Sequence, residues 1–310
     1  MREINNIHDK YFKEFMENPD MARKLLEVIL PQELKEIIEL SHLIPQKDSF
    51  ISKDLKEAYS DLLFKSKLRE GEEVYIYFLI EHKSYFYEYT SLQLLKYMLN
   101  IWEREIDKEN QKKLTPVIPV VFYHGEEKWR IPSEFRSLIK GIEKYPVLGK
   151  YIPDFRHILF ELKPETDIEN LKELAIKLFL RTLLLRRKVE EEGFEIFFER
   201  VFWEIKELPD EQGYLFAAIM FYIIETVEGV DITALKEYTN RILPERGSDI
   251  VTIAEKLREE GRKEGMEKGI ERGIEKTAIN ALKKGFDVKT IAELTGLPIE
   301  KIGELKKQLN

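Results

Sequence analysis

Hydrophobic and polar residues alternate with two different periods along the first part of the chain. Residues 8–40 place hydrophobic residues three or four positions apart, which predicts helices interrupted near Pro19 and at Pro31. Residues 58–68 and 74–84 instead concentrate hydrophobic and aromatic residues on either side of a short charged loop. Two such runs around a short loop predict a β-hairpin.

The pattern after the hairpin changes between helix and strand. Residues 89–106 return to helical spacing, residues 114–125 form a short hydrophobic run that ends at Gly125, and residues 155–162 form a further strand candidate. Strands separated by a helical segment indicate βαβ connectivity. We therefore predict an α/β core in which helices flank a mixed sheet.

From about residue 167 onward the strand patterns disappear. Segments 168–189, 194–208 and 211–227 have helical periodicity and predict three packed helices, and residues 239–250 are the best candidate for a linker. The predicted organisation is a core over residues 1–165, a helical extension over 166–238, the linker, and a C-terminal helical tail over 251–310.

Glycines recur every four residues in the tail, at Gly261, Gly265, Gly269 and Gly273. An interior glycine destabilises a helix by roughly 1 kcal/mol relative to alanine, so four of them need an explanation. One explanation is the close approach of two helices along the glycine positions, which favours a homodimer. The other is a partly helical linker made of slipped repeats. The density of charge excludes a membrane helix of the small-residue type.

The end of the tail, residues 287–308, has the spacing of a helix-turn-helix. Ala292 lies close to the expected turn, Gly296 falls where the turn requires a positive φ, and Ile302 follows on the second helix. Two interpretations stay open, namely DNA contact and a small helical element for dimerisation or protein docking. The candidates for DNA contact are Lys289, Thr295 and Lys301.

Composition narrows the class of protein. The chain has no cysteine, which excludes a disulfide scaffold, cysteine-ligated zinc and a thiol nucleophile. We expect a cytoplasmic protein, because the N-terminal residues lack the hydrophobic stretch of a signal peptide and no hydrophobic run is long enough to span a membrane. There is no phosphate-binding loop and no dinucleotide fingerprint, so no nucleotide cofactor is expected.

Charge is unevenly distributed. The net charge is −8, and residues 251–310 carry 13 basic against 11 acidic residues, which leaves −10 on residues 1–250. A surface coated with basic residues for nucleic acid is therefore excluded for the main body. Any contact of that body with phosphate must be local or assisted by metal ions.

Glu81 and Lys83 interrupt the second strand of the predicted hairpin. Because strand side chains alternate between faces, the two charges project from the same face. If the loop is centred on Gly71, the residue opposite Glu81 is Asp61, and opposed Cβ atoms in an antiparallel pair lie only about 4.5–5.5 Å apart. This inference is conditional on the register, since a slip of one residue would separate the charges.

Two neighbouring carboxylates are stable only with a cation or a shared proton between them. A hard divalent cation such as Mg²⁺, with Mn²⁺ or Ca²⁺ as alternatives, prefers oxygen ligands of this kind. The alternative is a partly exposed network of ion pairs among Asp61, Glu81 and Lys83 at the end of the hairpin.

A family resemblance favours the metal site. The Asp…Glu-x-Lys pattern resembles the PD-(D/E)xK nuclease signature, and the wider sequence is similar to the recombination-promoting nuclease, or YhgA-like transposase, family. The segments that carry the likeness are HDKYFKEF at 8–15, YSDLLFKSKL at 59–68, YFLIEHKS at 77–84, SLQLLKYM at 91–98 and PVVFYHG at 119–125. One departure is Ser60, where the signature has a proline.

The resemblance implies a restriction-endonuclease-like core and a divalent-metal-dependent DNA endonuclease linked to recombination or mobile-element biology. By position, Asp61 and Glu81 would be metal ligands, together with the backbone carbonyl of His82. Lys83 would orient the attacking water or stabilise the charge that develops on the phosphate. The metal would lower the pKa of the water and act as a Lewis acid.

Other residues are candidates for supporting roles. Gln93 and Tyr97 lie on one helical face and resemble a Q-x-x-x-Y element of exonuclease-like relatives, although they also fit the polar edge of an amphipathic helix. An acidic ligand from the first helix would be Glu14 or Glu17, and the sequence does not choose between them. His124, at a strand end, we interpret as structural.

We therefore predict a catalytic homodimer that cuts DNA. The competing hypothesis is a non-catalytic DNA-binding or regulatory protein that acts through residues 287–310 and keeps an inert nuclease-like body. Retention of Asp61, Glu81 and Lys83 together favours the first.

Overall fold

The computed structural model describes residues 2–46, 61–81, 87–109, 113–125, 127–185, 188–189, 193–227 and 230–308. It divides into two compact units, residues 1–247 and residues 248–310.

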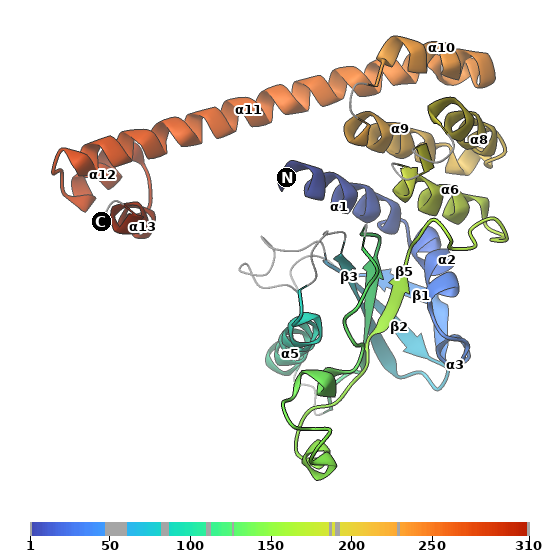
Figure 1. Ribbon diagram of the computed structural model, residues 1–310, viewed down its shortest axis with the longest axis horizontal. Coiled ribbons are helices and arrows are strands. Elements are labelled where there is room, and N and C mark those ends of the chain that lie inside the picture. Colours follow the sequence, from blue (N-terminus) through green and yellow to red (C-terminus); the bar gives the residue numbers. More distant parts are fainter. Residues whose placement is uncertain are drawn as a thin grey trace. The chain divides into compact units, whose positions relative to one another are not determined.

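The first unit is built around a five-stranded mixed sheet (Figure 1), as the sequence predicts. Its strand order is β1-β2-β3-β4-β5; the first two pairings are antiparallel and the last two are parallel. The strands are β1 (Ile38–Pro45), β2 (Asp61–Leu68), β3 (Glu73–Glu81), β4 (Val117–Tyr123) and β5 (Ile158–Glu161).

The β2–β3 hairpin closes through a three-residue loop. Lys67 pairs with Glu73, and the Leu68 amide donates a hydrogen bond of 2.7 Å to the Glu72 carbonyl. Gly71 is the last loop residue and has a φ of +99°. A three-residue hairpin loop typically requires a left-handed residue at this position, and glycine adopts that conformation without a steric penalty.

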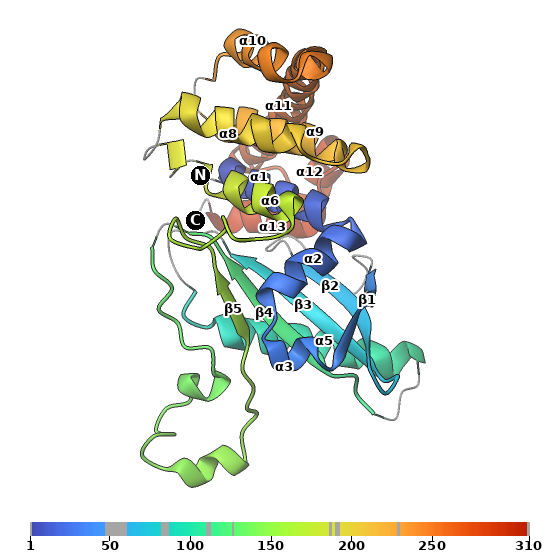
Figure 2. The same ribbon diagram turned by 90° about the vertical axis from the view of Figure 1, so that its right-hand side faces the viewer.

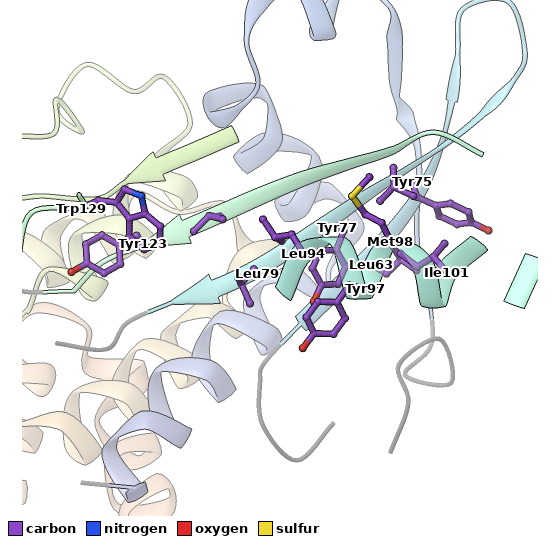
Figure 3. Close-up of a cluster of buried hydrophobic side chains, with 12 residues drawn as sticks. Leu63, Tyr75, Tyr77, Leu79, Leu94, Tyr97, Met98, Ile101, Tyr123 and Trp129 are labelled. Carbon is purple, nitrogen blue, oxygen red and sulfur yellow. The ribbon is translucent and has the colours of Figure 1, made fainter. Parts of the chain in front are cut away.

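Helix α5 (Thr90–Glu109) connects the parallel strands β3 and β4 and covers one face of the sheet. Its buried side chains Leu94, Tyr97, Met98 and Ile101 enter one cluster with residues from the strands (Figure 3). The strand residues of this cluster are Leu63, Tyr75, Tyr77, Leu79, Val117, Val121 and Tyr123, and Trp129 joins them from the segment after β4. The βαβ unit predicted from the sequence is thereby confirmed.

The opposite face of the sheet is covered by the N-terminal helices. Helix α1 (Arg2–Met16) places the Phe12 ring 4.8 Å from Phe122 and 6.5 Å from Phe78, measured between centroids. Helix α2 (Pro19–Ile29) follows at once, because Asn18 caps it by accepting hydrogen bonds from the amides of Asp20 and Met21. The predicted break near Pro19 is therefore confirmed.

A helical layer packs on α1 (Figure 2). The Phe15 ring of α1 stacks on Phe179, with centroids 3.8 Å apart, and Arg181 is buried in an ion pair of 2.8 Å with Glu204. The α-helices of this layer are α6 (Leu174–Leu183), α8 (Phe194–Lys206), α9 (Tyr214–Thr226) and α10 (Ile232–Ile242). Shorter helices elsewhere in the chain are α3 (Gln32–Lys35), η2 (Phe135–Leu138), η3 (Pro146–Lys150), η4 (Asp210–Gln212) and η5 (Pro244–Arg246).

Two local predictions differ from the structure. Residues 38–40 belong to strand β1 rather than to a helix, because they pair with β2 at the edge of the sheet. Most of the predicted linker 239–250 is helical, since α10 extends to Ile242, η5 follows, and the next helix begins at Gly247.

The second unit contains most of α11 (Gly247–Lys283) together with α12 (Val288–Thr295) and α13 (Ile299–Gln308). The four repeated glycines lie inside α11, so the helical interpretation of this repeat holds and the partly helical linker does not. Gly296 ends α12 with a φ of +71°, as the predicted turn requires. Ala278, Ile291, Ile302 and Leu305 pack the end of α11 against α12 and α13.

Across the described part of the chain, every helix is too short or too polar to cross a lipid bilayer.

Candidate functional site at the end of strands β2 and β3

Asp61 and Glu81 lie at the same end of the β2–β3 hairpin. Asp61 is the first residue of β2, and Glu81 is the last residue of β3. Asp61 pairs with Leu79, so Glu81 lies two residues beyond the partner of Asp61 rather than opposite it. The predicted pairing of Asp61 with Glu81 is therefore wrong. Its cause is Gly71, which is the third residue of the loop and not its centre.

With the observed register, Asp61 and Glu81 still occupy one alternating series of positions, so they remain on the same face of the hairpin. A shift of two residues preserves the face, because the side-chain period of a strand is two. Positions 61 and 81 thus belong to the series that contains Leu63, Tyr77 and Leu79, which pack against α5. In an antiparallel pair such diagonal neighbours are about 7–8 Å apart, a separation that one cation can bridge with carboxylate ligands.

The remaining predicted site residues lie outside the part of the chain that the structure describes. Lys83 and His82 lie beyond the described residues, and for Asp61 and Glu81 the structure describes the backbone alone. Among the side chains that are described, no three histidine, aspartate or glutamate residues form a group able to hold a metal ion. The predicted donors are all oxygen atoms, which is the set that a hard divalent cation prefers.

Gln93 and Tyr97 are both buried, so they are not the exposed polar edge of a helix. Tyr97 is 2% exposed, and its ring stacks on Tyr77 with centroids 4.7 Å apart. Gln93 is 6% exposed and lies one helical turn ahead of Tyr97, next to Leu94 of the cluster shown in Figure 3. Within the described residues, neither side-chain amide atom of Gln93 has a hydrogen-bond partner.

An unpartnered buried amide is costly. Leaving such a group without a hydrogen bond destabilises a protein by about 1–3 kcal/mol. Gln93 is on the first turn of α5, and its neighbour Leu94 packs with Leu79, the partner of Asp61. The residues at this end of the sheet therefore fit a bound polar group that would satisfy the Gln93 amide.

A histidine pair lies at the end of the neighbouring strand. Glu81 pairs with Tyr123 of β4, and His124 follows directly. The ring of His124 is 9% exposed and makes an edge contact with His8 of α1, with centroids 5.1 Å apart. His8 Nδ1 lies 2.6 Å from the hydroxyl of Tyr222 in α9. His124 thus packs where the end of β4 meets α1 and α9. This location agrees with our interpretation of His124 as a structural residue.

Sequence reasoning missed this cluster for a simple reason. His8 and Tyr222 are separated by 214 positions. No local pattern or short motif connects residues at such a separation. The only indication that α1 and α9 pack together was the presence of aromatic residues in both helices. This indication is weak, because hydrophobic helices commonly contain aromatic residues.

The two acids of the first helix are exposed. Phe12 and Phe15 of α1 face the interior, whereas Glu14 is exposed on the same helix and Glu17 is exposed directly after its end. Partial burial is the main cause that raises the pKa of Glu14; Lys10 opposes the rise and Glu17 adds to it. The choice between Glu14 and Glu17 stays a prediction.

The three candidates for DNA contact all lie in the second unit, but they differ in exposure and in the contacts that their side chains make. Lys289 is exposed near the start of α12. The Thr295 hydroxyl donates a hydrogen bond of 2.6 Å to the Ile291 carbonyl, and Lys301 forms an ion pair of 3.1 Å with Glu275 of α11. Lys289 is therefore the best placed of the three for a phosphate contact.

Comparison with known proteins shows the family to which this chain belongs. The family described as "Putative transposase, YhgA-like" matches residues 6–213, and the chain belongs to that family. The resemblance to the YhgA-like family seen in the sequence is thereby confirmed.

Three relatives are similar over most of their length. Recombination-promoting nuclease RpnD of Escherichia coli O157:H7 is 27% identical over 82% of this chain and 94% of its own. Recombination-promoting nuclease RpnC of Escherichia coli K12 is 28% identical over 96% of both chains. The inactive recombination-promoting nuclease-like protein RpnE of the same strain is 26% identical over 94% of both. No solved structure matches this chain.

Proposed function

We propose that this protein is a divalent-metal-dependent DNA endonuclease that acts in recombination. The observation that carries the proposal is the location of Asp61 and Glu81, which end adjacent strands at one side of the sheet and share one alternating series of positions. The names of the similar proteins RpnD and RpnC, both recombination-promoting nucleases, support the same activity.

Each residue of the proposed site has a chemical role. Asp61, Glu81 and the His82 carbonyl would hold Mg²⁺, which when bound lowers the pKa of a water molecule and neutralises phosphate charge. Lys83 would position the water and stabilise negative charge on the phosphate. Gln93 would donate or accept a hydrogen bond through its buried amide, and Tyr97 would hold α5 against β3 through its stacking on Tyr77.

Plasmid nicking tests the proposal. Wild-type protein is incubated with supercoiled DNA and Mg²⁺, Mn²⁺ or Ca²⁺ and is compared with Asp61→Asn and Lys83→Ala. Loss of a metal ligand or of the lysine should lower the nicking rate by 10²-fold or more, on the order of what electrostatic groups contribute. Glu70→Gln is the matched control, because Glu70 is an exposed acid in the loop of the same hairpin.

Two outcomes would contradict the proposal. Equal cleavage with all three metals and with both variants would indicate a contaminating nuclease. A wild-type protein that binds Mg²⁺ no more tightly than Asp61→Asn, measured by calorimetry, would exclude the metal site independently of any cleavage.

A second candidate is a non-catalytic DNA-binding protein. The name of the similar protein RpnE marks it as inactive, and exposed Lys289 on α12 offers a phosphate contact. DNA binding without cleavage that is lost in Lys289→Glu and unchanged in Asp61→Asn would favour this function over the endonuclease.

A further inference from the structure

The segment between β4 and β5 leaves the sheet and returns to it. It forms an arm that consists of a stem, made of two legs that lie side by side, and a folded tip. β5 runs parallel to β4, so the chain must travel from the end of β4 back toward the start of β5. Figure 2 shows this arm extending away from the sheet, with short 3₁₀ helices in place of a long crossover helix.

The stem of the arm is held by paired contacts between its two legs. The Phe135 ring stacks on Phe155 with centroids 5.4 Å apart, and the Phe135 amide donates a hydrogen bond of 2.9 Å to the Phe155 carbonyl. Arg136 donates a hydrogen bond of 2.8 Å to Asp154, and a single antiparallel bridge joins residues 134 and 156. These contacts fix the direction in which the arm projects.

The tip of the arm, residues 139–152, is folded through successive short-range hydrogen bonds. The Tyr145 amide donates to Gly141, the Leu148 amide to Tyr145, and the Tyr151 amide to Leu148, at 2.9, 3.0 and 2.9 Å. In a 3₁₀ helix the side chains three residues apart are eclipsed, and the rise is about 2.0 Å per residue. Leu148 lies within the 3₁₀ helix η3, and Tyr145 and Tyr151 cap its two ends, so the three residues follow one another at the three-residue spacing of one aromatic row.

A second row runs beside the first. Lys144, Val147 and Lys150 have the same three-residue spacing, shifted by one position. The Lys144 ammonium lies 5.4 Å from the centroid of the Tyr145 ring, which is within the range of a cation–π interaction. The tip thus presents an aromatic row next to a row that begins and ends with lysine.

The side chains of the aromatic row are exposed to an unusual degree. Tyr151 is 82% exposed, Tyr145 53% and Leu148 40%, and Val147 of the second row is 57% exposed. Scattered single hydrophobic residues on a surface need no explanation, but contiguous ones indicate a binding site. No other element of the described chain covers these side chains.

The charge of the tip indicates the kind of partner. Residues 139–152 contain three lysines and one glutamate, although residues 1–250 as a whole carry a net charge of −10. A local cationic surface in an acidic body attracts a polyanion selectively at this place. Aromatic faces beside lysines are the combination with which proteins hold single strands: bases stack on the rings and phosphates meet the ammonium groups.

We infer that the tip of the arm binds single-stranded nucleic acid. Tyr145 and Tyr151 stack on unpaired bases, and Lys144 and Lys150 contact the phosphates beside them. The choice of nucleic acid among polyanions rests on the proposed function. The arm itself is a separate contact, because it projects from the sheet on the side where β5 begins (Figure 2), whereas Asp61 and Glu81 lie at the end where the parallel strand β3 finishes.

Binding of the full chain to fluorescent oligo(dT) of about 16 nucleotides tests the inference. Fluorescence anisotropy is measured in EDTA, so that cleavage does not contribute. Base stacking is worth about 1–3 kcal/mol per base, so Tyr151→Ala and Tyr145→Ala should each weaken binding by about 5- to 150-fold. Trp203→Ala is the matched control, since Trp203 is 49% exposed and also has a lysine, Lys206, 4.8 Å from its ring.

Salt dependence tests the lysine row. The slope of log K against log salt concentration is about −0.7 for each phosphate contacted on a single strand. The double variant Lys144→Ala/Lys150→Ala should therefore reduce the slope by about 1.4, whereas Lys206→Ala should leave it unchanged. A duplex of the same length should bind the tip variants and the wild type alike.

The opposite results would overturn the inference. It fails if Tyr145→Ala and Tyr151→Ala bind oligo(dT) as tightly as the wild type. It also fails if these variants instead lose binding to anionic phospholipid vesicles, or lose self-association in sedimentation, with oligo(dT) binding intact. Failure of the proposed function is a distinct result, because Asp61→Asn would then nick plasmid as the wild type does while Tyr151→Ala still weakens oligo(dT) binding.

Discussion

Tyr97 of α5 stacks on Tyr77 of β3, with ring centroids 4.7 Å apart and planes inclined by 30°. This contact joins the helix that carries Gln93 to the strand that ends at Glu81. This aromatic pair therefore helps to fix the position of the helix relative to the candidate site, together with the packing of Leu94, Met98 and Ile101.

Truncation of this pair should destabilise the protein strongly. Tyr97→Ala removes a fully buried ring, and such changes cost about 3–5 kcal/mol. Tyr97→Phe keeps the stacking and should cost much less. Urea unfolding monitored by circular dichroism measures both, with Leu99→Ala as the control because Leu99 is exposed on the same helix. Equal stability of Tyr97→Ala and Leu99→Ala would show that the stacking does not hold α5 in place.

Gln93→Met should separate stability from activity. Methionine fills a similar volume and removes the unpartnered amide, so the free energy of unfolding should rise by about 1–3 kcal/mol. If the amide serves the proposed site, plasmid nicking should fall by about tenfold or more in the same variant. Lys96→Met, on the exposed side of α5, should change neither quantity. A variant that is more stable and fully active would leave Gln93 without a role in cleavage.

His157 should make the protein less stable in mild acid. Burial lowers the pKa of His157 to about 4, from an ordinary value near 6.5. The unfolded chain therefore binds a proton at a pH where the folded chain does not, and stability falls as the pH decreases from about 6.5 to 4. The loss attributable to this residue reaches about 3 kcal/mol at most.

Urea unfolding of the wild type and His157→Gln at about pH 7 and pH 4.5 checks this expectation. The variant should lose less stability between the two pH values than the wild type does. His157 Nδ1 lies 3.4 Å from the Ser91 hydroxyl, and glutamine is able to keep a hydrogen bond there. An identical pH dependence in both proteins would mean that other groups cause the acid sensitivity.

The homodimer predicted from the glycine repeat should depend on α11. A Cβ added at Gly261, Gly265, Gly269 or Gly273 meets no atom of the described chain within 4 Å, so the glycines leave room for a second helix. Met266 and Ile270, one position after two of these glycines, are 61% and 57% exposed. Met266→Lys/Ile270→Lys should therefore convert a dimer into a monomer.

Light scattering after size-exclusion chromatography measures that change in mass. Leu294→Lys is the control, because Leu294 is 70% exposed on α12, outside the glycine repeat. A wild-type protein that is monomeric at all concentrations, or a dimer that survives the double substitution, would exclude dimerisation through this face.

Most of the sheet could be predicted from the sequence because its strands carry strong local signals. The two runs around Gly71 and the run that ends at Gly125 are hydrophobic, short and bounded by turn residues, and they form β2, β3 and β4. Strand β1 was missed because Ile37, Ile38 and Leu40 continue the spacing of the preceding helix. Its pairing with β2 is a tertiary contact, which the local periodicity of the sequence does not indicate.

The relative register of Asp61 and Glu81 was predictable to within two residues. The alternation of side chains gave the face correctly, since it depends on parity alone. The exact pairing depended on whether Gly71 is the middle or the last residue of its loop, and the sequence permits both. The burial of Gln93 was not predictable, because a polar residue at that position of an amphipathic helix is expected to be exposed to solvent.

The long-range hydrogen bonds of α1 and of the residue that caps α2 have a consequence for synthesis on the ribosome. His8 and Asn18 contact Tyr222 and Tyr214, which lie 214 and 196 positions later. At a translation rate of about 5–20 residues per second, α1 waits roughly 10–40 s for its partners. Within that interval Phe12 can already contact Phe78 and Phe122, whereas the contact of α1 with Tyr222 cannot form. A nascent or prematurely terminated chain would therefore lack the contacts of His8 and Asn18 with α9, and with them the complete packing of the N-terminal helices.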